Sequence, residues 1–119
     1  MSARYIAGRA AEYEARDILQ KAGYDVMRAA GSHGLFDLIA WKGRKDILLI
    51  QVKRTRSQVP VSTYHQEIAK IAEAVGGDLL PGSAHLWVKT TRGWIRYLIT
   101  SGGSVPVRWE DGRGVVSSS

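Results

Sequence analysis

The N-terminal part of the chain carries its apolar side chains with the period of an α-helix. Between residues 8 and 22 they recur every three or four positions, at Ala11, Ala15, Ile18, Leu19 and Ala22. That spacing forms one stripe on an amphipathic helix. Gly23 follows at the position where helices commonly end in a left-handed residue. The pattern therefore predicts a helix over residues 8–22.

Short apolar runs separated by turn residues follow this helix and predict β-strands. The first three cover residues 24–30, 36–41 and 46–53. A short basic turn over residues 42–45 makes the second and third an antiparallel hairpin. The loop over residues 31–34 begins and ends with Gly, which permits a positive φ or the close approach of another group.

A second helical pattern and further strands fill the rest of the chain. Residues 62–75 carry an apolar stripe, with Ser62 or Thr63 as the expected N-cap and Gly76 as the start of a helix stop. Later strands are expected at residues 84–90, 94–100 and 105–109, the last as a short strand or an extended arm. The order αβββαββ, followed by that segment, predicts an α/β fold with a mixed β-sheet flanked by helices.

The length of 119 residues allows one domain, which we expect over residues 1–111. A Gly- and Ser-rich stretch over residues 112–119 is expected to form a flexible tail. The chain has no Cys, which excludes disulfides and thiolate metal sites. Neither a long apolar run nor a signal-peptide pattern is present, so we expect a cytoplasmic protein with no membrane partner; a viral origin stays open.

The net charge is strongly positive, at +6 with an isoelectric point of about 9.9. An excess of positive charge favours polyanionic partners. Basic residues cluster in two segments, 42–45 and 53–56. A solvated basic surface without a partner has the same composition, so charge alone does not separate DNA from RNA or from an acidic protein.

Three polar side chains interrupt the apolar strands. Asp37 lies near the start of one strand, and Gln51 and Lys53 lie two residues apart on the next, where they share a face. Such groups within apolar runs seldom lack a partner or a task. Carboxylate and amide oxygens suit Mg²⁺, and an ammonium stabilises phosphate charge. The pattern predicts a site for a divalent cation and a phosphate.

The first helix offers a further carboxylate for this site. Glu12 and Glu14 lie on opposite flanks of the apolar stripe, each roughly 75–85° from its centre at ~100° per residue. The helical wheel by itself does not choose between them.

Several segments occur together in a fixed order. They are Gly8-x-x-x-Glu12, Gly23-Tyr24, Arg28-Ala29-Ala30-Gly31-Ser32, Phe36-Asp37-Leu38-Ile39-Ala40 and Ile50-Gln51-Val52-Lys53. In this combination the chain resembles the archaeal-type Holliday junction resolvases of the PD-(D/E)XK nuclease superfamily. The resemblance covers residues 1 to about 57, and the spacing from Gly8 through Glu12 to Gly23 is its most specific part.

The resemblance implies a restriction-endonuclease-like fold and a homodimer that cuts four-way DNA junctions in recombination and repair. It implies phosphodiester hydrolysis with Mg²⁺, or Mn²⁺ as an alternative, and no small-molecule cofactor. Two rival functions stay open: another repair or restriction-type endonuclease of the superfamily, and a protein that binds branched DNA without cutting it.

The resemblance also assigns roles to individual residues. It selects Glu12 over Glu14 as the helix carboxylate, and it makes Asp37 a metal ligand, Lys53 the catalytic lysine and Ser32 the serine beside the scissile phosphate. Gln51 occupies the position of a third metal ligand. Arg28 matches a basic residue that supports the site or the DNA.

Two features depart from the family pattern. The loop from Ser32 to Asp37 is one residue longer, and Gln51 stands where the family has a Glu. The amide keeps one oxygen ligand but removes a negative charge, so metal affinity should fall. Glu67 or Asp46 could supply the missing carboxylate.

Phosphate contacts are expected from basic and loop side chains along the chain. Such contacts hold DNA without reading its sequence, so the shape of the junction would be recognised. The candidates are Arg4, Arg9, Arg28, His33, Lys42, Arg44, Lys45, Arg54 and Arg56.

Overall fold

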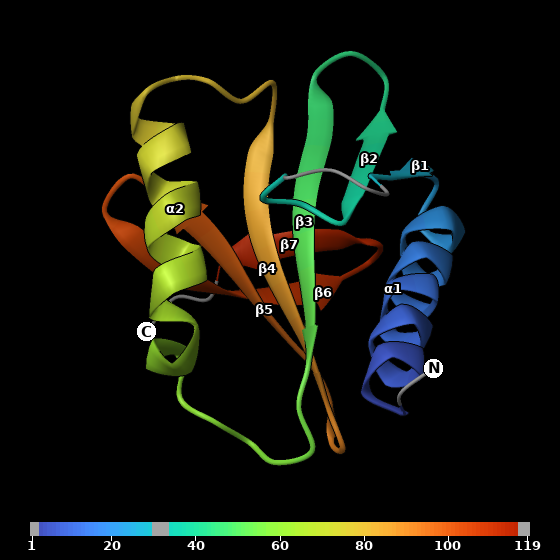
Figure 1. Cartoon of the computed structure of the whole chain (residues 1–119). Helices are drawn as coiled ribbons and strands as arrows, with labels where there is room; N and C mark the ends of the chain where they lie inside the picture. Colours follow the sequence, from blue (N-terminus) through green and yellow to red (C-terminus); the bar gives the residue numbers. More distant parts are fainter. Residues whose placement is uncertain (1–2, 30–33, 117–119) are drawn as a thin grey trace.

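A mixed β-sheet with a helix against each face makes up the structure (Figure 1). The computed structural model describes residues 3–29 and 34–116. The elements of this part are α1 (Ala3–Lys21), β1 (Asp25–Arg28), β2 (Leu38–Lys42), β3 (Asp46–Arg54), the 3₁₀ turn η1 (Val61–Tyr64), α2 (His65–Gly76), β4 (Ser83–Thr90), β5 (Gly93–Thr100), β6 (Gly103–Glu110) and β7 (Arg113–Val116). The α/β fold expected from the sequence is confirmed.

The strands lie side by side in chain order, from β1 to β7. Each neighbouring pair is antiparallel except β3 and β4, which run parallel with Leu48 opposite Ser83 and Arg54 opposite Lys89. A parallel pair needs a long crossover connection, and α2 forms it here. β3 is therefore a central strand, paired along both edges.

The alternation of side chains along β4 shows which helix covers which face. Leu86 and Val88 pack in a cluster with Ile71 of α2, whereas Trp87 packs with Ala15 of α1. Successive side chains of a strand point to opposite faces of the sheet. The two helices therefore bury opposite faces, and each face has its own hydrophobic core.

α1 begins earlier than the predicted residue 8, at Ala3, and contains Gly8 in its interior. One interior Gly costs a helix only about 1 kcal/mol, which the many Ala and Arg neighbours tolerate. The predicted end is confirmed. Gly23 has a φ of 97°, and the N–H groups of Gly23 and Tyr24 each donate to a carbonyl of the last turn at 3.0 Å.

α2 starts differently from the prediction. Ser62 and Thr63, the expected N-cap residues, lie inside η1, where the Thr63 N–H donates to the Pro60 carbonyl at 3.0 Å. α2 follows at His65 without a side-chain cap, because the 3₁₀ turn already leads into it. The helix ends at Gly76, as the sequence predicts.

The C-terminal segment corrects the prediction of a flexible tail beyond residue 111. Arg113–Val116 form β7, and β6 covers Gly103–Glu110 rather than residues 105–109. Asp111 and Gly112 have φ values of 50° and 76°, as a two-residue hairpin turn requires. A Cβ added to Gly112 would lie 3.1 Å from that of Ala22, so this turn packs against the end of α1.

Three tryptophans pack together in the hydrophobic cluster beside α1. The Trp87 ring centre lies 5.7 Å from that of Trp94 and 5.2 Å from that of Trp109. The Arg96 guanidinium lies 4.3 Å from the centre of the Trp87 ring. Burial lowers the pKa of Arg96 to about 10, so the side chain stays charged at neutral pH and is stabilised by the ring faces.

None of the helices in the described ranges combines the length and the hydropathy needed to cross a lipid bilayer.

A substitution at Gly82, just before β4, tests how closely β3 and β4 pack. A Cβ at this position would lie 2.7 Å from the Ile47 Cβ and would also meet the Ile47 carbonyl. Gly82→Ala should therefore lower the free energy of unfolding by about 1–3 kcal/mol in urea denaturation.

Gly8→Ala is the matched control. A Cβ at Gly8 meets no atom within 4 Å, so this substitution should instead stabilise the helix, by about 0.5–1 kcal/mol. A Gly82→Ala protein as stable as wild type would contradict the close packing of these strands.

Candidate active site

Asp37 lies just before β2 and is fixed by both neighbouring strands. Its backbone N–H donates to the Ile50 carbonyl, and its carbonyl accepts from the Ala29 N–H, each at 2.9 Å. Its carboxylate oxygen Oδ2 accepts the Val52 N–H at 2.7 Å. The side chain is therefore held against β3, with Oδ1 left for another partner.

Gln51 and Lys53 alternate along β3 on one face. The β2–β3 register sets Leu38 opposite Ile50, so Asp37 continues that register opposite Gln51. The Oε1 atom of Gln51 is buried and has no hydrogen-bond partner among the described residues. Buried polar oxygens are rarely left unpaired, so an unpaired amide oxygen beside a carboxylate marks a place for a ligand.

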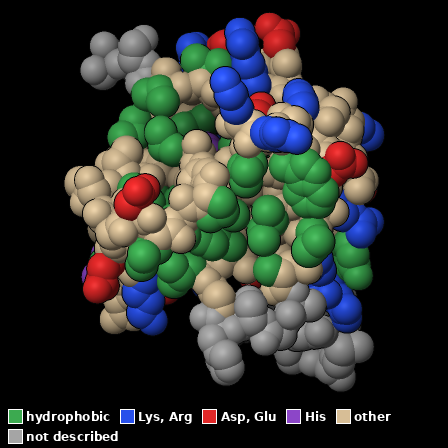
Figure 2. All heavy atoms as spheres, turned by 90° about the horizontal axis from the view of Figure 1, so that it is seen from above, with side chains coloured by type: hydrophobic (Ala, Val, Ile, Leu, Met, Phe, Trp, Pro, Cys, Tyr) green, Lys and Arg blue, Asp and Glu red, His purple; other side chains and the backbone are tan. Residues whose placement is uncertain are grey.

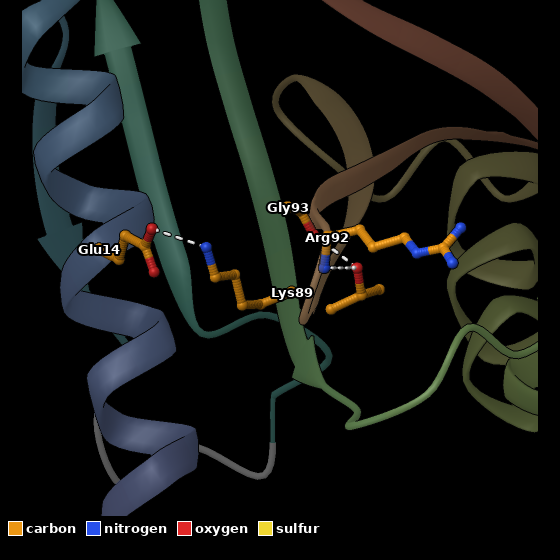
Figure 3. Close-up of polar contacts among 5 residues, drawn as sticks. Glu14, Lys89, Arg92 and Gly93 are labelled. Carbon is orange, nitrogen blue, oxygen red and sulfur yellow. Dashed lines mark hydrogen bonds and ion pairs between the residues drawn. The ribbon is translucent and has the colours of Figure 1, made fainter.

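The structure distinguishes the two helix carboxylates that the helical wheel leaves equivalent. Glu12 Oε1 accepts a hydrogen bond from Arg28 Nε of β1 at 3.1 Å. Glu14 turns to the other flank, where Lys89 Nζ of β4 donates to it at 2.9 Å (Figure 3). Glu12 therefore faces the edge of the sheet that carries Asp37, and Glu14 does not.

The charges around Asp37 show that these groups converge. Burial raises the pKa of Asp37, and the hydrogen bond from the Val52 N–H opposes that rise. The negative charge of Glu12 raises the pKa further, whereas Lys53 and Arg28 lower it. The side chains of Glu12, Lys53 and Arg28 therefore lie within electrostatic range of the Asp37 carboxylate.

The donors at this place suit a hard cation. Glu12 and Asp37 offer carboxylate oxygens and Gln51 an amide oxygen, the ligand types that Mg²⁺ and Mn²⁺ prefer. No cluster of three or more His, Cys, Asp and Glu that could hold a metal occurs in the described ranges. A metal site here would depend on the amide oxygen of Gln51 as well as on the two carboxylates.

Neither of the two replacement carboxylates considered for Gln51 belongs to this cluster. Asp46 lies five positions before Gln51, about 17 Å along β3 and on the alternate face. Its Oδ2 accepts the Tyr24 hydroxyl at 2.8 Å. Glu67 lies in the first turn of α2, near Tyr64, whose pKa is raised by burial and further by the charge of Glu67.

Ser32 and His33 lie outside the described residues. Arg4 lies in the first turn of α1, and the Arg9 guanidinium lies 6.0 Å from the centre of the Tyr13 ring.

The remaining basic candidates divide between the two ends of β3. Lys53 and Arg54 are at its end, with Arg56 just beyond. Lys42, Arg44 and Lys45 belong to the β2–β3 hairpin at its start. Asp46 and Lys53 are seven positions apart along the strand, about 23 Å. The structure therefore forms two basic regions rather than one.

Sequence reasoning left out two basic residues near the end that carries Lys53. Lys89 is opposite Arg54 in the parallel pair, and Arg92 is exposed in the β4–β5 turn. Thr90 Oγ1 fixes this turn by accepting the Arg92 N–H and donating to the Gly93 carbonyl, each at 3.0 Å (Figure 3). The sequence shows that the β4–β5 turn is basic. Only the parallel register of β3 and β4 shows that this turn lies beside the end of β3.

The chain is similar to known proteins in sequence and in fold. The model of the family described as archaeal Holliday junction resolvase (Hjc) matches residues 3–101. The crossover junction endodeoxyribonuclease Hjc of Methanocaldococcus jannaschii is 38% identical over 89 residues, which cover 75% of this chain and 63% of the relative. The chain thus spans less than two thirds of the length of that curated relative.

A solved structure is similar over most of the fold. It is that of Hjc from Archaeoglobus fulgidus, a Holliday junction resolvase of an archaeal hyperthermophile. The match has a TM-score of 0.57 at 25% identity and covers 78% of this chain and 73% of the other.

The pKa of Asp37 tests the convergence of charges directly. Glu12→Gln removes a negative neighbour and should lower this pKa, whereas Lys53→Gln removes a positive neighbour and should raise it. A ¹³C NMR titration of the Asp37 carboxyl carbon measures both. Glu14→Gln is the matched control, and a shift as large as that of Glu12→Gln would contradict the placement of the two helix acids.

Proposed function

Because the chain belongs to the archaeal Holliday junction resolvase family, we propose that it is a structure-selective endonuclease that resolves four-way DNA junctions. The observation that carries this proposal is the placement of Glu12, Gln51 and Lys53 around Asp37, at the point where β2 begins beside β3. Oxygen ligands for a cation and an ammonium for a phosphate are what phosphodiester hydrolysis requires of a protein.

The proposed cofactor is Mg²⁺, with Mn²⁺ as an alternative. Glu12, Asp37 and Gln51 would hold it, and the unpaired Oε1 of Gln51 is the feature that fits this role. A bound cation of this kind offsets phosphate charge and lowers the pKa of an attacking water.

The residues of the chain itself prepare this site. The Val52 N–H holds the Asp37 carboxylate in one orientation, and Arg28 holds Glu12. Lys53, from the same strand as Gln51, would stabilise the charge that develops on the phosphate in the transition state. These contacts exist before DNA binds, so the site needs little reorganisation when the substrate arrives.

The two basic regions fit a branched substrate. Lys53, Arg54 and Arg56 lie beside the site, whereas the β2–β3 hairpin carries its basic residues at the other end of β3. Phosphate contacts so far apart would engage separate parts of a junction without reading sequence. A four-way junction needs two symmetric cuts, so we propose an isologous homodimer that presents two such sites.

Gln51 favours one rival function, a protein that grips branched DNA without cutting it. Compared with a carboxylate, the amide removes one negative charge from a site that already contains Arg28 and Lys53. Loss of one charge at ~4 Å is worth up to a few kcal/mol of cation binding near a surface. Cleavage with Mg²⁺ and with Mn²⁺ separates an enzyme from a binder.

Lys53→Ala tests catalysis. With Mg²⁺, the wild-type chain should cut a labelled four-way junction, and the variant should cut it at least about a hundredfold more slowly because transition-state charge is left unpaired. Duplex and flap substrates run beside the junction would identify another nuclease of the superfamily.

Lys70→Ala, on the exposed side of α2, is the control for Lys53→Ala and should cut like wild type. A wild-type chain that binds junctions tightly and leaves all strands whole in both metals would end the proposal of an enzyme.

Gln51→Glu tests the metal site. The added charge should lower the Mg²⁺ concentration for half-maximal cutting by about tenfold, or ~1.4 kcal/mol. Gln66→Glu makes the same chemical change on the exposed surface of α2 and should leave that concentration unchanged. An unchanged or higher requirement in Gln51→Glu would show that Gln51 is not a metal ligand.

A further inference from the structure

A cavity lies on the α1 face of the sheet, between the central strands and the C-terminal hairpin. It has a volume of about 290 Å³ and is lined by side chains of β3 to β7 together with Tyr24. Its walls are largely apolar, with Leu48, Leu98 and Trp109 among them. This volume is near the lower end of the range for ligand pockets, ~300–1,000 Å³, and has room for one small ligand.

This cavity is separate from the candidate active site. Asp46, which lines it, lies about 17 Å along β3 from Gln51 and on the alternate face. Strand β7, which forms part of its wall, is separated from β3 in the sheet by β4, β5 and β6. A ligand in this cavity would therefore be bound by residues other than those of the candidate active site.

His85 lines this cavity and has a buried ring nitrogen without a partner among the described residues. The side chain is 8% exposed, and its Nε2 has no hydrogen-bond partner among the described residues. Burial lowers the pKa of His85 to about 4, so the ring is neutral at pH 7 and can donate or accept one hydrogen bond. The residue thus adds to the lining of the cavity a ring whose buried Nε2 has an unused hydrogen-bonding capacity.

Asp46 is the second polar group, and it is held in a fixed orientation. The Tyr24 hydroxyl donates to Asp46 Oδ2 at 2.8 Å, and burial raises the pKa of Tyr24 to about 12, so this donor keeps its proton. Each carboxylate oxygen accepts more than one hydrogen bond. Asp46 therefore retains the capacity to accept two parallel N–H groups from a planar ligand.

Positive charge lies around the same cavity. Arg113 lines it from β7, and Lys42 lies 4.5 Å from the centre of the Tyr24 ring and opposite Asp46 in the β2–β3 register. The face of the molecule at this end of β3, seen from above in Figure 2, gathers several Lys and Arg side chains beside a hydrophobic area. A ligand with an apolar ring and an anionic group matches this surface.

We propose that the cavity binds a guanine base together with its phosphate. Guanine carries two adjacent N–H donors, on N1 and N2, which pair with the two oxygens of one carboxylate. Adenine and cytosine place a ring acceptor beside their amino group, and thymine places its single N–H between two carbonyls, so each would meet Asp46 with a repulsive contact. His85 would bond a ring or carbonyl atom of the base, and Arg113 would bind the phosphate.

Two sources supply this chemistry: a free guanine nucleotide, or a guanine extruded from a DNA strand. Extrusion of a base from a strand costs only a few kcal/mol, and least where the strand is already unpaired. Binding of an extruded base presupposes the proposed function, because the DNA strand comes from the junction. Binding of a free nucleotide does not depend on that function.

Histidine NMR on the full chain tests the site. Guanosine monophosphate should shift the His85 ring signals in a saturable way, and the adenosine and cytidine monophosphates should bind at least about tenfold more weakly. Asp46→Asn should weaken guanosine monophosphate binding at least about tenfold, since hydrogen bonds to a charged acceptor are lost. Asp25→Asn, an exposed carboxylate on β1 outside the lining, is the matched control and should bind like wild type.

A second variant keeps the proposal falsifiable if Asp46→Asn fails to fold. Ser83→Leu changes an exposed residue of the lining and should block binding by filling the cavity. Equal His85 shifts with ribose 5-phosphate, or wild-type affinity in both variants, would overturn the proposal.

Short oligonucleotides distinguish the two sources. A thymidine hexamer with one guanine should displace guanosine monophosphate if an extruded base is the ligand, and an all-thymine hexamer should not. Displacement by neither would assign the site to a free nucleotide.

The outcome is independent of cleavage. A chain that binds the nucleotide but leaves junctions whole would overturn the proposed function alone. A chain that cuts junctions while His85 stays unshifted would overturn this inference alone.

Discussion

The hydrogen bond from the Val52 N–H to the Asp37 carboxylate is the contact on which the site geometry depends. It joins the residue that precedes β2 to the middle of the central strand, between Gln51 and Lys53. A carboxylate tied to a backbone group has little rotational freedom, so its free oxygen keeps one direction relative to the neighbouring side chains. The carboxylate and amide oxygens and the positively charged side chains therefore keep fixed positions beside Asp37. Arg28 links this arrangement to α1 through its hydrogen bond to Glu12.

The opposite faces of β3 serve different purposes. One face carries Gln51 and Lys53, and the other buries Ile50 and Val52 beneath α1. Because successive side chains alternate, a shift of one residue in the register would bury the polar pair and expose the core. The parallel pairing with β4 fixes that register, since Gln51 lies opposite Leu86 and Val52 opposite Trp87.

Much of the fold follows from local sequence patterns. The apolar stripe ending at Gly23 predicted α1, and the short basic turn predicted the β2–β3 hairpin. The parallel pairing of β3 with β4 depends instead on how α2 packs, which no local pattern encodes. β7 was missed because a Gly- and Ser-rich composition outweighed the Asp111-Gly112 turn, although that pair is a strong hairpin signal.

The sequence predicted which residue types form the candidate site, but it did not predict which side chains contact one another. Alternation placed Gln51 and Lys53 on one face, whereas the helical wheel left Glu12 and Glu14 equivalent. Only Arg28 of β1 and Lys89 of β4, far apart along the chain, separate them. The cavity on the α1 face could not be predicted from the sequence for the same reason. Its lining residues Tyr24, Asp46, His85 and Arg113 come together only in the folded sheet.

The order of strands in the sheet has a consequence for how the chain folds. Six neighbouring pairs form the sheet of the described residues, and all except β3–β4 are antiparallel, most of them closed by short turns. Such hairpins form quickly from residues close in sequence, because little entropy is lost in closing a short loop. The β3–α2–β4 crossover is the exception, so we expect the pairing of β3 with β4, which joins the N-terminal and C-terminal groups of strands, to be the slow step of folding.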